Sequence, residues 1–234
     1  MVKYYQVGGS VRDSIIGIKS KDIDYAVEAE SYDDMRLDII NRGGKIYLEK
    51  PEYLTIRAKI LHFGDCDFVL CRKDGNYYDG RRPESVEPGT LFDDLSRRDF
   101  TMNAIAINES GKYIDYFNGI RHINHKLIVC VGNAEDRFAE DSLRLIRALR
   151  FSITKGFSLD SKIDSCLKSP KIVSQLKGVS PDRIREEMNK MFAYDTFASL
   201  VLLQKYWRIR NYVFDNGVLS LKVYQKGTQK GIQK

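Results

Sequence analysis

Two aspartates separated by one residue are the side chains of this chain best suited to metal chemistry. Asp22 and Asp24 begin a run, residues 22–28, in which polar and apolar residues alternate as in a β-strand, so both carboxylates are expected on one face. Neighbouring carboxylates repel each other unless a cation or solvent lies between them. Carboxylate oxygens suit Mg²⁺, which takes further ligands from substrate phosphates. The pair predicts a magnesium site; a plain solvent-facing strand is the alternative.

A glycine-rich turn precedes the two aspartates and predicts an anion site. Gly8, Gly9 and Ser10 separate an expected strand from an expected helix, where glycines let backbone N–H groups approach an anion. Arg12, in the first turn of that helix, adds a fixed charge suited to phosphate oxygens. The turn and Arg12 together predict a phosphate-binding corner, although tight turns explain most Gly-Gly pairs.

A third carboxylate is expected if two metal ions are to act on an in-line displacement. Asp67 is the candidate, because it lies in the otherwise apolar run from Cys66 to Cys71. An aspartate on the buried face of a strand is costly unless a metal or a partner satisfies it. The other interpretation is that Asp65 and Asp67 flank a turn.

Charged residues of both signs surround a short asparagine in the segment from Asp94 to Ala104. Arg98 is suited to triphosphate oxygens, and Asn103 to a hydrogen bond with a ribose hydroxyl. Taken alone, the segment fits a helix cap with salt bridges equally well.

The composition describes an ordinary globular protein. Hydrophobic residues make up 43% and charged residues 30% of the 234, which excludes disordered, collagen-like and coiled-coil chains. No apolar run approaches the ~18 residues that span a bilayer, and the polar start is no signal peptide, so we expect a cytoplasmic protein without membrane contact. The four cysteines lack metal-site spacing and are expected to be free buried thiols.

The elements that would position these residues are predicted from hydrophobic periodicity. Strands are expected at residues 3–8, 22–28, 45–48, 54–61, 66–72, 104–107 and 113–116. Helices are expected at residues 11–17, 32–42, 97–104, 135–151, 160–168, 180–193 and 196–206, with a polar loop at 73–93. The chain is therefore expected to be an α+β protein, with a front unit at 1–125 and an all-helical remainder.

Positive charge is concentrated behind the front unit. Residues 201–234 carry seven basic residues and one acid, within a chain of formal net charge +6. Such a distribution fits a metal–carboxylate site in front and contact with a polyanion behind, or simply a solvated terminus.

Taken together, the motifs resemble those of the class II tRNA nucleotidyltransferase and bacterial poly(A) polymerase family. The resemblance covers roughly residues 3–192 and rests on five motifs in the family's order and spacing: Gly8–Asp13, Asp22–Asp24, Arg97–Ala104, Glu140–Arg144 and Val179–Glu187. The last motif departs from the family pattern at Asp182, where a glutamate is common. The resemblance implies a polymerase-beta-like head at 1–125, a helical neck for base recognition at 126–192, and a short helical body with a basic tail at 193–234.

The same resemblance implies roles for the matching residues. Two Mg²⁺ ions are expected on Asp22 and Asp24. The incoming nucleotide is expected to contact Gly8, Gly9, Ser10, Arg12, Arg98, Asn103, Asp141, Arg144, Arg147 and Arg150. Family members use an acid and an arginine, here Asp141 and Arg144, to read the base of CTP or ATP without a nucleic-acid template.

The helix expected at 135–151 adds a constraint of its own. Residues three apart lag by ~60° on an α-helix, so the four residues at this spacing from Asp141 to Arg150 should spread over half the circumference. Asp141 and Arg144 then offer an acceptor and a donor to a base edge, while Arg147 and Arg150 face phosphate or the product strand. An exposed basic helix face is the alternative.

We therefore expect transfer of C and A residues from CTP and ATP to the 3′ end of tRNA, by a two-metal mechanism at Asp22, Asp24 and Asp67. A poly(A) polymerase, or an enzyme that adds only part of the CCA sequence, is the alternative, because the same motifs serve those activities. A non-catalytic RNA-binding relative is a further alternative, disfavoured by the presence of both Asp22 and Asp24. The expected partners are RNA and nucleoside triphosphates. Whether helix 196–206 packs on the neck or forms a dimer surface is left open.

Overall fold

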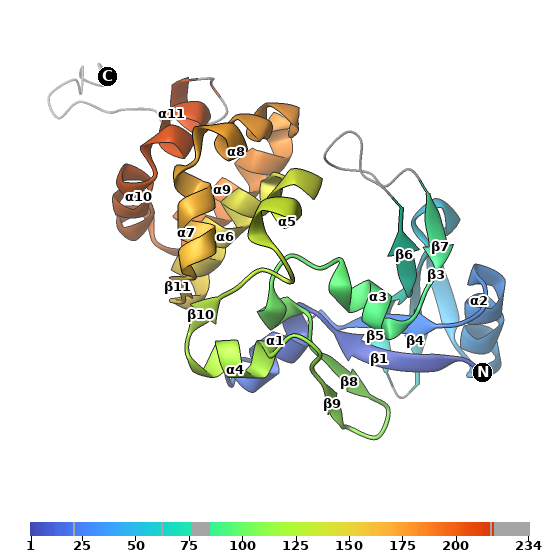
Figure 1. Ribbon diagram of the computed structural model, residues 1–234. Helices are drawn as coiled ribbons and strands as arrows, with labels where there is room; N and C mark the ends of the chain where they lie inside the picture. Colours follow the sequence, from blue (N-terminus) through green and yellow to red (C-terminus); the bar gives the residue numbers. More distant parts are fainter. Residues whose placement is uncertain (21, 62, 76–84, 216, 218–234) are drawn as a thin grey trace, which may run out of the picture.

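A mixed β-sheet forms the centre of the front unit (Figure 1). The computed structural model describes residues 1–20, 22–61, 63–75, 85–215 and 217. Within them the sheet has the strand order β3-β4-β5-β2-β1-β8-β9. Its strands are β1 (Lys3–Val7), β2 (Asp24–Glu28), β3 (Lys45–Lys50), β4 (Thr55–Ile60), β5 (Gly64–Leu70), β8 (Ala106–Asn108) and β9 (Tyr113–Ile114). Strands β2 and β5 run parallel, and the other neighbours run antiparallel.

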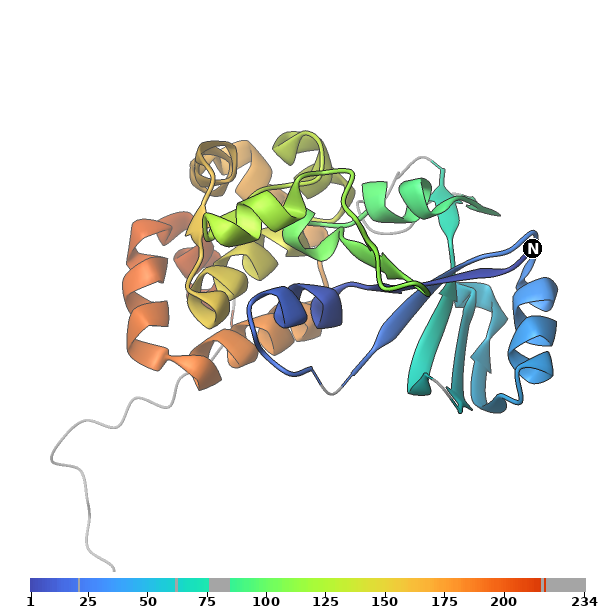
Figure 2. The same cartoon turned by 90° about the horizontal axis from the view of Figure 1, so that it is seen from below.

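The two faces of this sheet are covered differently. Helix α2 (Tyr32–Asn41) lies against one face (Figure 2), where Met35 and Ile39 join a buried cluster with Phe68 of β5. Helix α3 (Leu91–Ser96) packs on the other face, over β1, β2 and β8. The rest of that second face, over β4 and β5, carries mostly polar side chains, which alternate along both strands with the buried residues of the first face.

Helices make up the second half of the chain. They are α5 (Ala134–Glu140), α6 (Leu143–Lys155), α7 (Ser161–Lys168), α8 (Pro170–Ser174), α9 (Pro181–Tyr194), α10 (Thr196–Lys205) and α11 (Trp207–Asp215). Two-residue strands, β10 (Leu127–Ile128) and β11 (Ser158–Leu159), pair in parallel beside them. The buried cluster around α6 and α9 also takes in Phe100, Ile105 and Val11, the last from α1 (Gly9–Ile15). The front unit and the helices therefore share one apolar core.

The α+β class and most of the expected elements are confirmed. Ser31 caps α2 as a helix start of this type should, because its side chain accepts a hydrogen bond from Asp34 N. The expected loop at 73–93 is wrong in part. It contains the end of β6 (Arg72–Asp74), β7 (Val86–Pro88) and the start of α3. Residues 76–84 of that stretch lie outside the described part of the chain, as do 218–234 of the basic tail.

Two expected helices are misplaced. The helix predicted at 97–104 is wrong, because Thr90 and Asp93 form a reciprocal capping box that starts α3 at Leu91. Beyond the end of α3 the chain forms only a short 3₁₀ turn, Thr101–Asn103. The helix predicted at 135–151 is two helices, because Asp141 adopts an extended backbone between α5 and α6.

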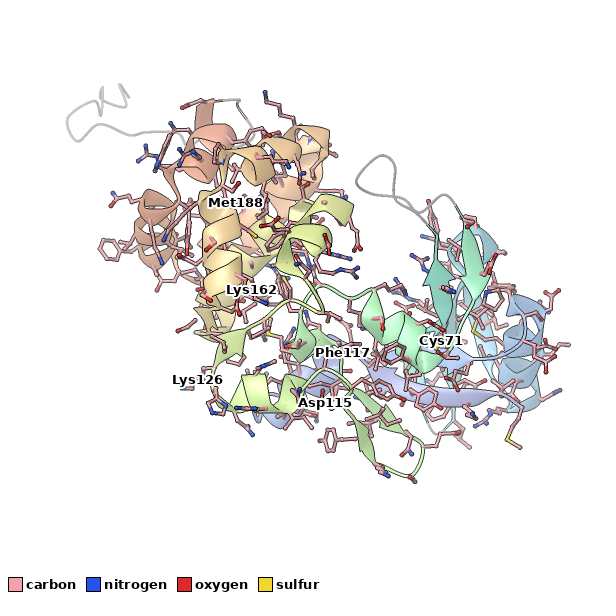
Figure 3. The ribbon with its side chains drawn as sticks, in the orientation of Figure 1. Cys71, Asp115, Phe117, Lys126, Lys162 and Met188 are labelled. Carbon is pink, nitrogen blue, oxygen red and sulfur yellow. The ribbon has the colours of Figure 1, made fainter. Side chains whose placement is uncertain are left out.

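The four cysteines are free and buried, as expected. Cys71 lies between β5 and α3 (Figure 3), where it joins the cluster formed by Leu91 and Leu95. Burial raises the pKa of the Cys71 thiol, so this side chain behaves as a small apolar group. No helix in the described ranges has the length and apolar character needed to cross a membrane.

Gly119 allows α4 (Gly119–Asn124) to pack closely on the 3₁₀ turn that follows α3, and its substitution tests that contact. A Cβ atom at Gly119 would lie 2.2 Å from Thr101 O and 2.7 Å from Ile105 Cγ1. We expect Gly119→Ala to lower the free energy of unfolding by about 1–3 kcal/mol, since the overlap must push α4 away from the 3₁₀ turn. Urea denaturation measures the change.

Gly178→Ala is the matched control, because a Cβ atom at Gly178 would meet no atom within 4 Å. It should change the free energy of unfolding by less than about 0.5 kcal/mol. Equal stability of the two variants would contradict the close approach at Gly119.

Candidate active site

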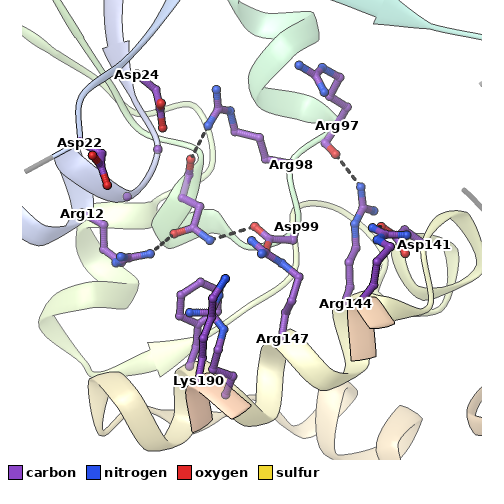
Figure 4. Close-up of a pocket in the computed structure, with 16 residues that line it drawn as sticks. Arg12, Asp22, Asp24, Arg97, Arg98, Asp99, Asp141, Arg144, Arg147 and Lys190 are labelled. Carbon is purple, nitrogen blue, oxygen red and sulfur yellow. Dashed lines mark hydrogen bonds and ion pairs between the residues drawn. The ribbon is translucent and has the colours of Figure 1, made fainter. Parts of the chain in front are cut away.

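One pocket of ≈ 710 Å³ lies between the sheet and the helices, and almost all of its wall is charged or glycine (Figure 4). Its lining residues are Gly8, Gly9, Arg12, Asp22, Asp24, Arg97, Arg98, Asp99, Asn103, Asp141, Arg144, Arg147, Arg150, Phe151, Arg183 and Lys190. The wall thus combines the β1–α1 turn, the start of β2, the segment after α3, and helices α6 and α9. Of the residues expected from the sequence, Ser10 and Asp67 are outside this wall.

The glycine turn leaves space between a carboxylate and a guanidinium. Gly8 has φ 76°, a conformation that strains any residue with a Cβ atom. A Cβ atom there would lie 3.2 Å from Arg98 Nη1 and 3.7 Å from Asp24 Oδ2. The hydroxyl of Ser10 donates to Val7 O and accepts from the Gln6 amide. The Ser10 side chain therefore stabilises the turn.

Asn103 joins three parts of the pocket. Its Oδ1 accepts a 2.6 Å hydrogen bond from Arg12 Nη1, and its Nδ2 donates to Asp99 Oδ1 at 2.9 Å. Its main-chain oxygen accepts from Arg98 Nη1 at 3.3 Å. Both ends of the Asn103 amide are thus engaged by protein, and the side chain positions Arg12; the ribose contact expected from the sequence stays a prediction.

Asp94 holds the two arginines that come directly after α3. It is 1% exposed, and its two oxygens accept separately from Arg97 and from Arg98, the latter at 2.8 Å. Burial by itself raises the pKa of Asp94, but Arg98 and Arg97 lower it further than burial raises it. Sequence reasoning missed this role; the spacing of an acid three and four residues before two arginines was the available signal.

Helix α6 presents two further arginines, each held by a buried acid. Arg147 Nη2 donates to Asp99 Oδ2 at 2.7 Å, and Arg150 Nε donates to Glu187 Oε2 at 2.5 Å. The ring of Phe151 lies 5.4 Å and 4.0 Å from these two guanidiniums, and 5.0 Å from that of Arg12. Arg147 and Arg150 line the same pocket as Asp141 and Arg144. The expectation that they face phosphate or the product strand stays a prediction.

Asp13 and Asp99 each come directly after an arginine, a spacing that predicts that they orient those arginines. Asp13 does so, since its Oδ1 accepts from Arg12 Nε at 2.9 Å and also from Lys155. Asp99 does not pair with the adjacent Arg98. It accepts instead from Arg147, which is 48 residues away in sequence.

Asp141 and Arg144, the expected base-reading pair, lie on the same pocket wall but in different backbone settings. Asp141 follows the last residue of α5 in extended backbone, and its Oδ1 accepts from Leu143 N while its Oδ2 accepts from Arg183 Nη2 at 3.1 Å. Arg144 is 9% exposed and donates to Arg97 O at 2.8 Å and to Glu140 Oε2. The angular argument from one continuous helix therefore does not apply. Arg183, which sequence reasoning passed over, fixes the Asp141 carboxylate.

Asp67 lies beside Asp24 on the neighbouring parallel strand, in direct register. Its oxygens accept from Arg57 Nε at 2.7 Å and Arg57 Nη2 at 2.6 Å, and its side chain is half-buried. The argument that Asp67 belongs to the buried face of its strand is wrong, since Cys66 and Phe68 occupy that face. Its closeness to Asp24, however, is what a third carboxylate requires.

The donor set of this corner fits Mg²⁺ shared with a phosphorylated ligand. Burial and the charge of Asp67 raise the pKa of Asp24, which is the effect expected where carboxylates converge and a cation would relieve their repulsion. No group of three or more His, Cys, Asp or Glu residues within the described ranges is arranged to hold a metal by itself. Mg²⁺ commonly takes one or two carboxylates and completes its shell from phosphates and water.

Residues 4–129 match the family described as the poly(A) polymerase head domain, which accounts for the sheet and the carboxylate corner. The chain belongs to the poly(A) polymerase head-domain family. Behind this head domain, residues 157–206 match a second family, described as a probable RNA- and SrmB-binding site of polymerase A.

Proteins similar to this member of the head-domain family include CCA-adding enzymes. Those of Bacillus cytotoxicus and Geobacillus kaustophilus are 41% identical over 188 residues and 39% over 196. The matches cover 80% and 81% of this chain, but 45% of each relative. The chain thus spans about half the length of the curated relatives it matches.

Solved structures that resemble the chain include complexes of related enzymes with nucleotides and with tRNA. A Bacillus stearothermophilus CCA-adding enzyme in complex with CTP has a TM-score of 0.73 and 33% identity, covering 86% of this chain and 47% of that one. A tRNA nucleotidyltransferase complexed with a primer tRNA and an incoming ATP analogue has a TM-score of 0.75 and 32% identity, covering 92% and 60%. These likenesses bear out the expected fold.

The ion pairs of Asp94 with Arg97 and Arg98 make the free energy of unfolding depend on pH. Because the pKa of folded Asp94 is lowered below its unfolded value, its contribution is present above about pH 4 and is lost as pH falls through the folded pKa. We expect Asp94→Asn to cost about 3 kcal/mol at pH 7, since Arg97 and Arg98 lose their buried counter-ion. The difference from the unaltered protein should shrink as the pH falls below about 4.

Urea denaturation at pH 7, 4 and 3 measures this dependence. Asp182→Asn, whose side chain is 86% exposed, is the control and should change the free energy of unfolding little at any pH. A pH-independent difference between Asp94→Asn and the unaltered protein would contradict the lowered pKa.

Proposed function

We propose that this chain is the catalytic portion of a template-independent RNA nucleotidyltransferase that adds C and A residues to the 3′ end of tRNA from CTP and ATP. The observation that carries the proposal is the composition of one pocket. The Asp22–Asp24 corner, Asp141 and seven arginines, Arg144 among them, surround a single ligand-sized space. A nucleoside triphosphate offers a group for each of these: a metal-binding phosphate, two further phosphates, and a base edge.

The glycine-turn side of the pocket is the proposed triphosphate site. Arg12 and Arg98 reach it from α1 and from the segment after α3, and both are held by protein acceptors before any ligand binds. Guanidiniums fixed in this way neutralise charge that develops on a leaving pyrophosphate without having to reorganise. Gly8 and Gly9 keep the turn free of side chains that would block the phosphates.

The α5–α6 side of the pocket is the proposed base site. A carboxylate accepts hydrogen bonds and a guanidinium donates them, so Asp141 and Arg144 together can pair with the edge of cytosine or adenine. Arg147 and Arg150 lie on the adjoining wall and are proposed to contact the nucleotide as well. Arg183 keeps the Asp141 carboxylate oriented, since its Nη2 donates to Asp141 Oδ2.

Asp22 and Asp24 are proposed to hold two Mg²⁺ ions, and Asp67 is proposed as the third catalytic carboxylate. When bound, Mg²⁺ lowers the pKa of the RNA 3′ hydroxyl and neutralises charge on the pyrophosphate. Asp67, on β5, lies next to Asp24 of β2 but outside the wall of the proposed nucleotide pocket. This position suits the side of the reaction centre from which the RNA 3′ hydroxyl would attack. The protein itself contributes positioning, which is the main requirement of nucleotidyl transfer.

The named relatives support CCA addition, and the head-domain family itself supports a second candidate. Poly(A) polymerase activity, or addition of part of the CCA sequence, would use the same pocket, because a shared scaffold does not determine the RNA substrate. A non-catalytic RNA-binding role is disfavoured by the intact Asp22–Asp24 corner. The division into head, neck and body at 125 and 192, and a cytoplasmic location, stay predictions.

Primer extension tests the function directly. The protein is incubated with Mg²⁺, CTP and ATP, together with a tRNA that lacks its 3′ CCA or with an unrelated oligoribonucleotide. We expect the tRNA to grow by C, C and A and then stop. Long A tracts on either RNA would assign poly(A) polymerase activity, and no extension under any of these conditions would sink the catalytic proposal.

Removal of either metal carboxylate should abolish turnover without unfolding the protein. We expect Asp22→Ala and Asp24→Ala to lower the extension rate on the order of 10³-fold or more, because charge on the reacting phosphate would go uncompensated. Asp33→Ala, an exposed acid on α2, is the control and should extend RNA at the unaltered rate. Substantial activity in Asp24→Ala would remove the two-metal assignment.

A further inference from the structure

Within the described part of the chain, side chains on the second face of the sheet are exposed or half-exposed over β3, β4 and β5, next to the proposed metal carboxylates. Helix α3 covers this face only over β1, β2 and β8. On β4 and β5 the residues that alternate with the core face are exposed or half-exposed, among them Arg57, Lys59 and Asp67. The open part of the sheet therefore continues directly from the Asp24 corner.

Strand register defines two rows of side chains across this open face. In one row Asp24 lies beside Asp67, and Asp67 lies beside Arg57. In the next row Asp65 lies beside Lys59, and Lys59 lies beside Lys45 of the edge strand β3. Directly paired positions point to the same face, so each row begins with acid near the catalytic corner. The first row continues through Arg57 to Leu48 at the edge, and the second ends there with Lys45.

The lysines at the β3 end of this face lower the stability of the sheet, so stability does not account for them. Lys45 and Lys59 are exposed and directly opposite each other, and like charges in such cross-strand pairs destabilise a sheet. Lys50 lies further along the same side of β3, in register with Thr55. Apolar surface is interleaved with the lysines, because Tyr47 and Leu48 are about half exposed. Basic groups interleaved with an aromatic ring are the features of single-stranded nucleic-acid sites.

We propose that the open face of β3 and β4, formed by Lys45, Lys50, Arg57 and Lys59, binds the sugar-phosphate backbone of single-stranded RNA just before its 3′ end. This rests on the proposed function, which brings an RNA 3′ hydroxyl to the Asp24 corner. Three strand spacings separate β2 from β3, about 14 Å, which is roughly four nucleotides of a stacked strand. The lysines are thus at the right distance for the nucleotides that precede the reacting end.

Arg57 links this surface to the reaction centre. Its guanidinium holds Asp67 through two hydrogen bonds, while its side chain is 58% exposed. An RNA strand that crosses the sheet from β3 towards β2 would place a phosphate at Arg57 on β4 just before it reaches Asp67 on β5. Because substitution of Arg57 would also disturb Asp67, the two lysines give the cleaner test.

The test compares two double variants that each remove two exposed lysines. Lys45→Ala/Lys59→Ala alters the proposed surface, and Lys3→Ala/Lys112→Ala alters the start of β1 and the β8–β9 turn. Fluorescence anisotropy with a labelled single-stranded 12-nucleotide RNA, without nucleoside triphosphates, reports binding independently of turnover. A labelled blunt hairpin RNA is the second probe, and primer extension gives kcat and the KM values for RNA and for ATP.

We expect Lys45→Ala/Lys59→Ala to weaken single-stranded RNA binding about five- to twentyfold at 0.1 M salt, and to reduce the slope of log affinity against log salt by about 1.4. The KM for RNA should rise by a similar factor, with kcat and the KM for ATP unchanged. The control double variant should match the unaltered protein in all of these. Thermal unfolding confirms that both variants fold.

An unchanged salt slope and affinity in Lys45→Ala/Lys59→Ala would overturn the surface, as would an equal loss in the control variant. A loss confined to the hairpin probe would overturn its assignment to single-stranded RNA. The proposed function fails in a different way, when the unaltered protein extends no RNA in the presence of Mg²⁺. The two failures are therefore separable.

Discussion

Positive charge gathered around one pocket is the constraint on which most of this structure depends. Seven arginines and one lysine line the pocket against four aspartates. Guanidiniums at such separations repel one another, and a buried one without a partner is costly. The fold compensates with acids placed behind the arginines. Asp94, Asp99 and Glu187 are each less than a tenth exposed, and each accepts from at least one of them. These acids thus hold the arginines in an arrangement that favours a polyphosphate before any ligand binds.

These same pairs connect the two halves of the chain. Asp99 belongs to the segment after α3, whereas its partner Arg147 is on α6, and Arg144 donates to the carbonyl oxygen of Arg97. Apolar packing acts in the same direction, since Phe100 lies in one cluster with the residues of α6 and α9. Displacement of α6 would therefore cost hydrogen bonds to charged groups as well as buried area. The relative placement of the Asp22–Asp24 corner and the Asp141–Arg144 pair depends on both kinds of contact.

Local patterns predicted most of the fold and most of the residues that line the pocket, and the failures have physical causes. The strand carrying Asp24, the glycine turn and the helix with Ser31 at its start are encoded by short-range signals, so they were predictable. The break at Asp141 was not, because residues on both sides keep helical periodicity and only a side-chain cap interrupts it. The buried acids were missed for a similar reason. Glu187 acquires its role from Arg147 and Arg150, which only the folded chain brings close, whereas Asp94 pairs with Arg97 and Arg98 of its own segment and its burial is what the sequence does not show.

The uncovered face of the sheet also ends at an edge strand, and its lysines have a second consequence. Among the residues that the structure describes, strand β3 pairs only with β4, and its sequence includes Tyr47 and Leu48 at about half exposure. An edge of this kind can recruit a strand from another molecule and start aggregation. Lys45 and Lys50 frame β3 and would be brought against the lysines of an identical edge in any such pairing. The positive charge that repels a second copy of the chain attracts a phosphate backbone. The same short strand therefore disfavours aggregation and favours the proposed binding of RNA.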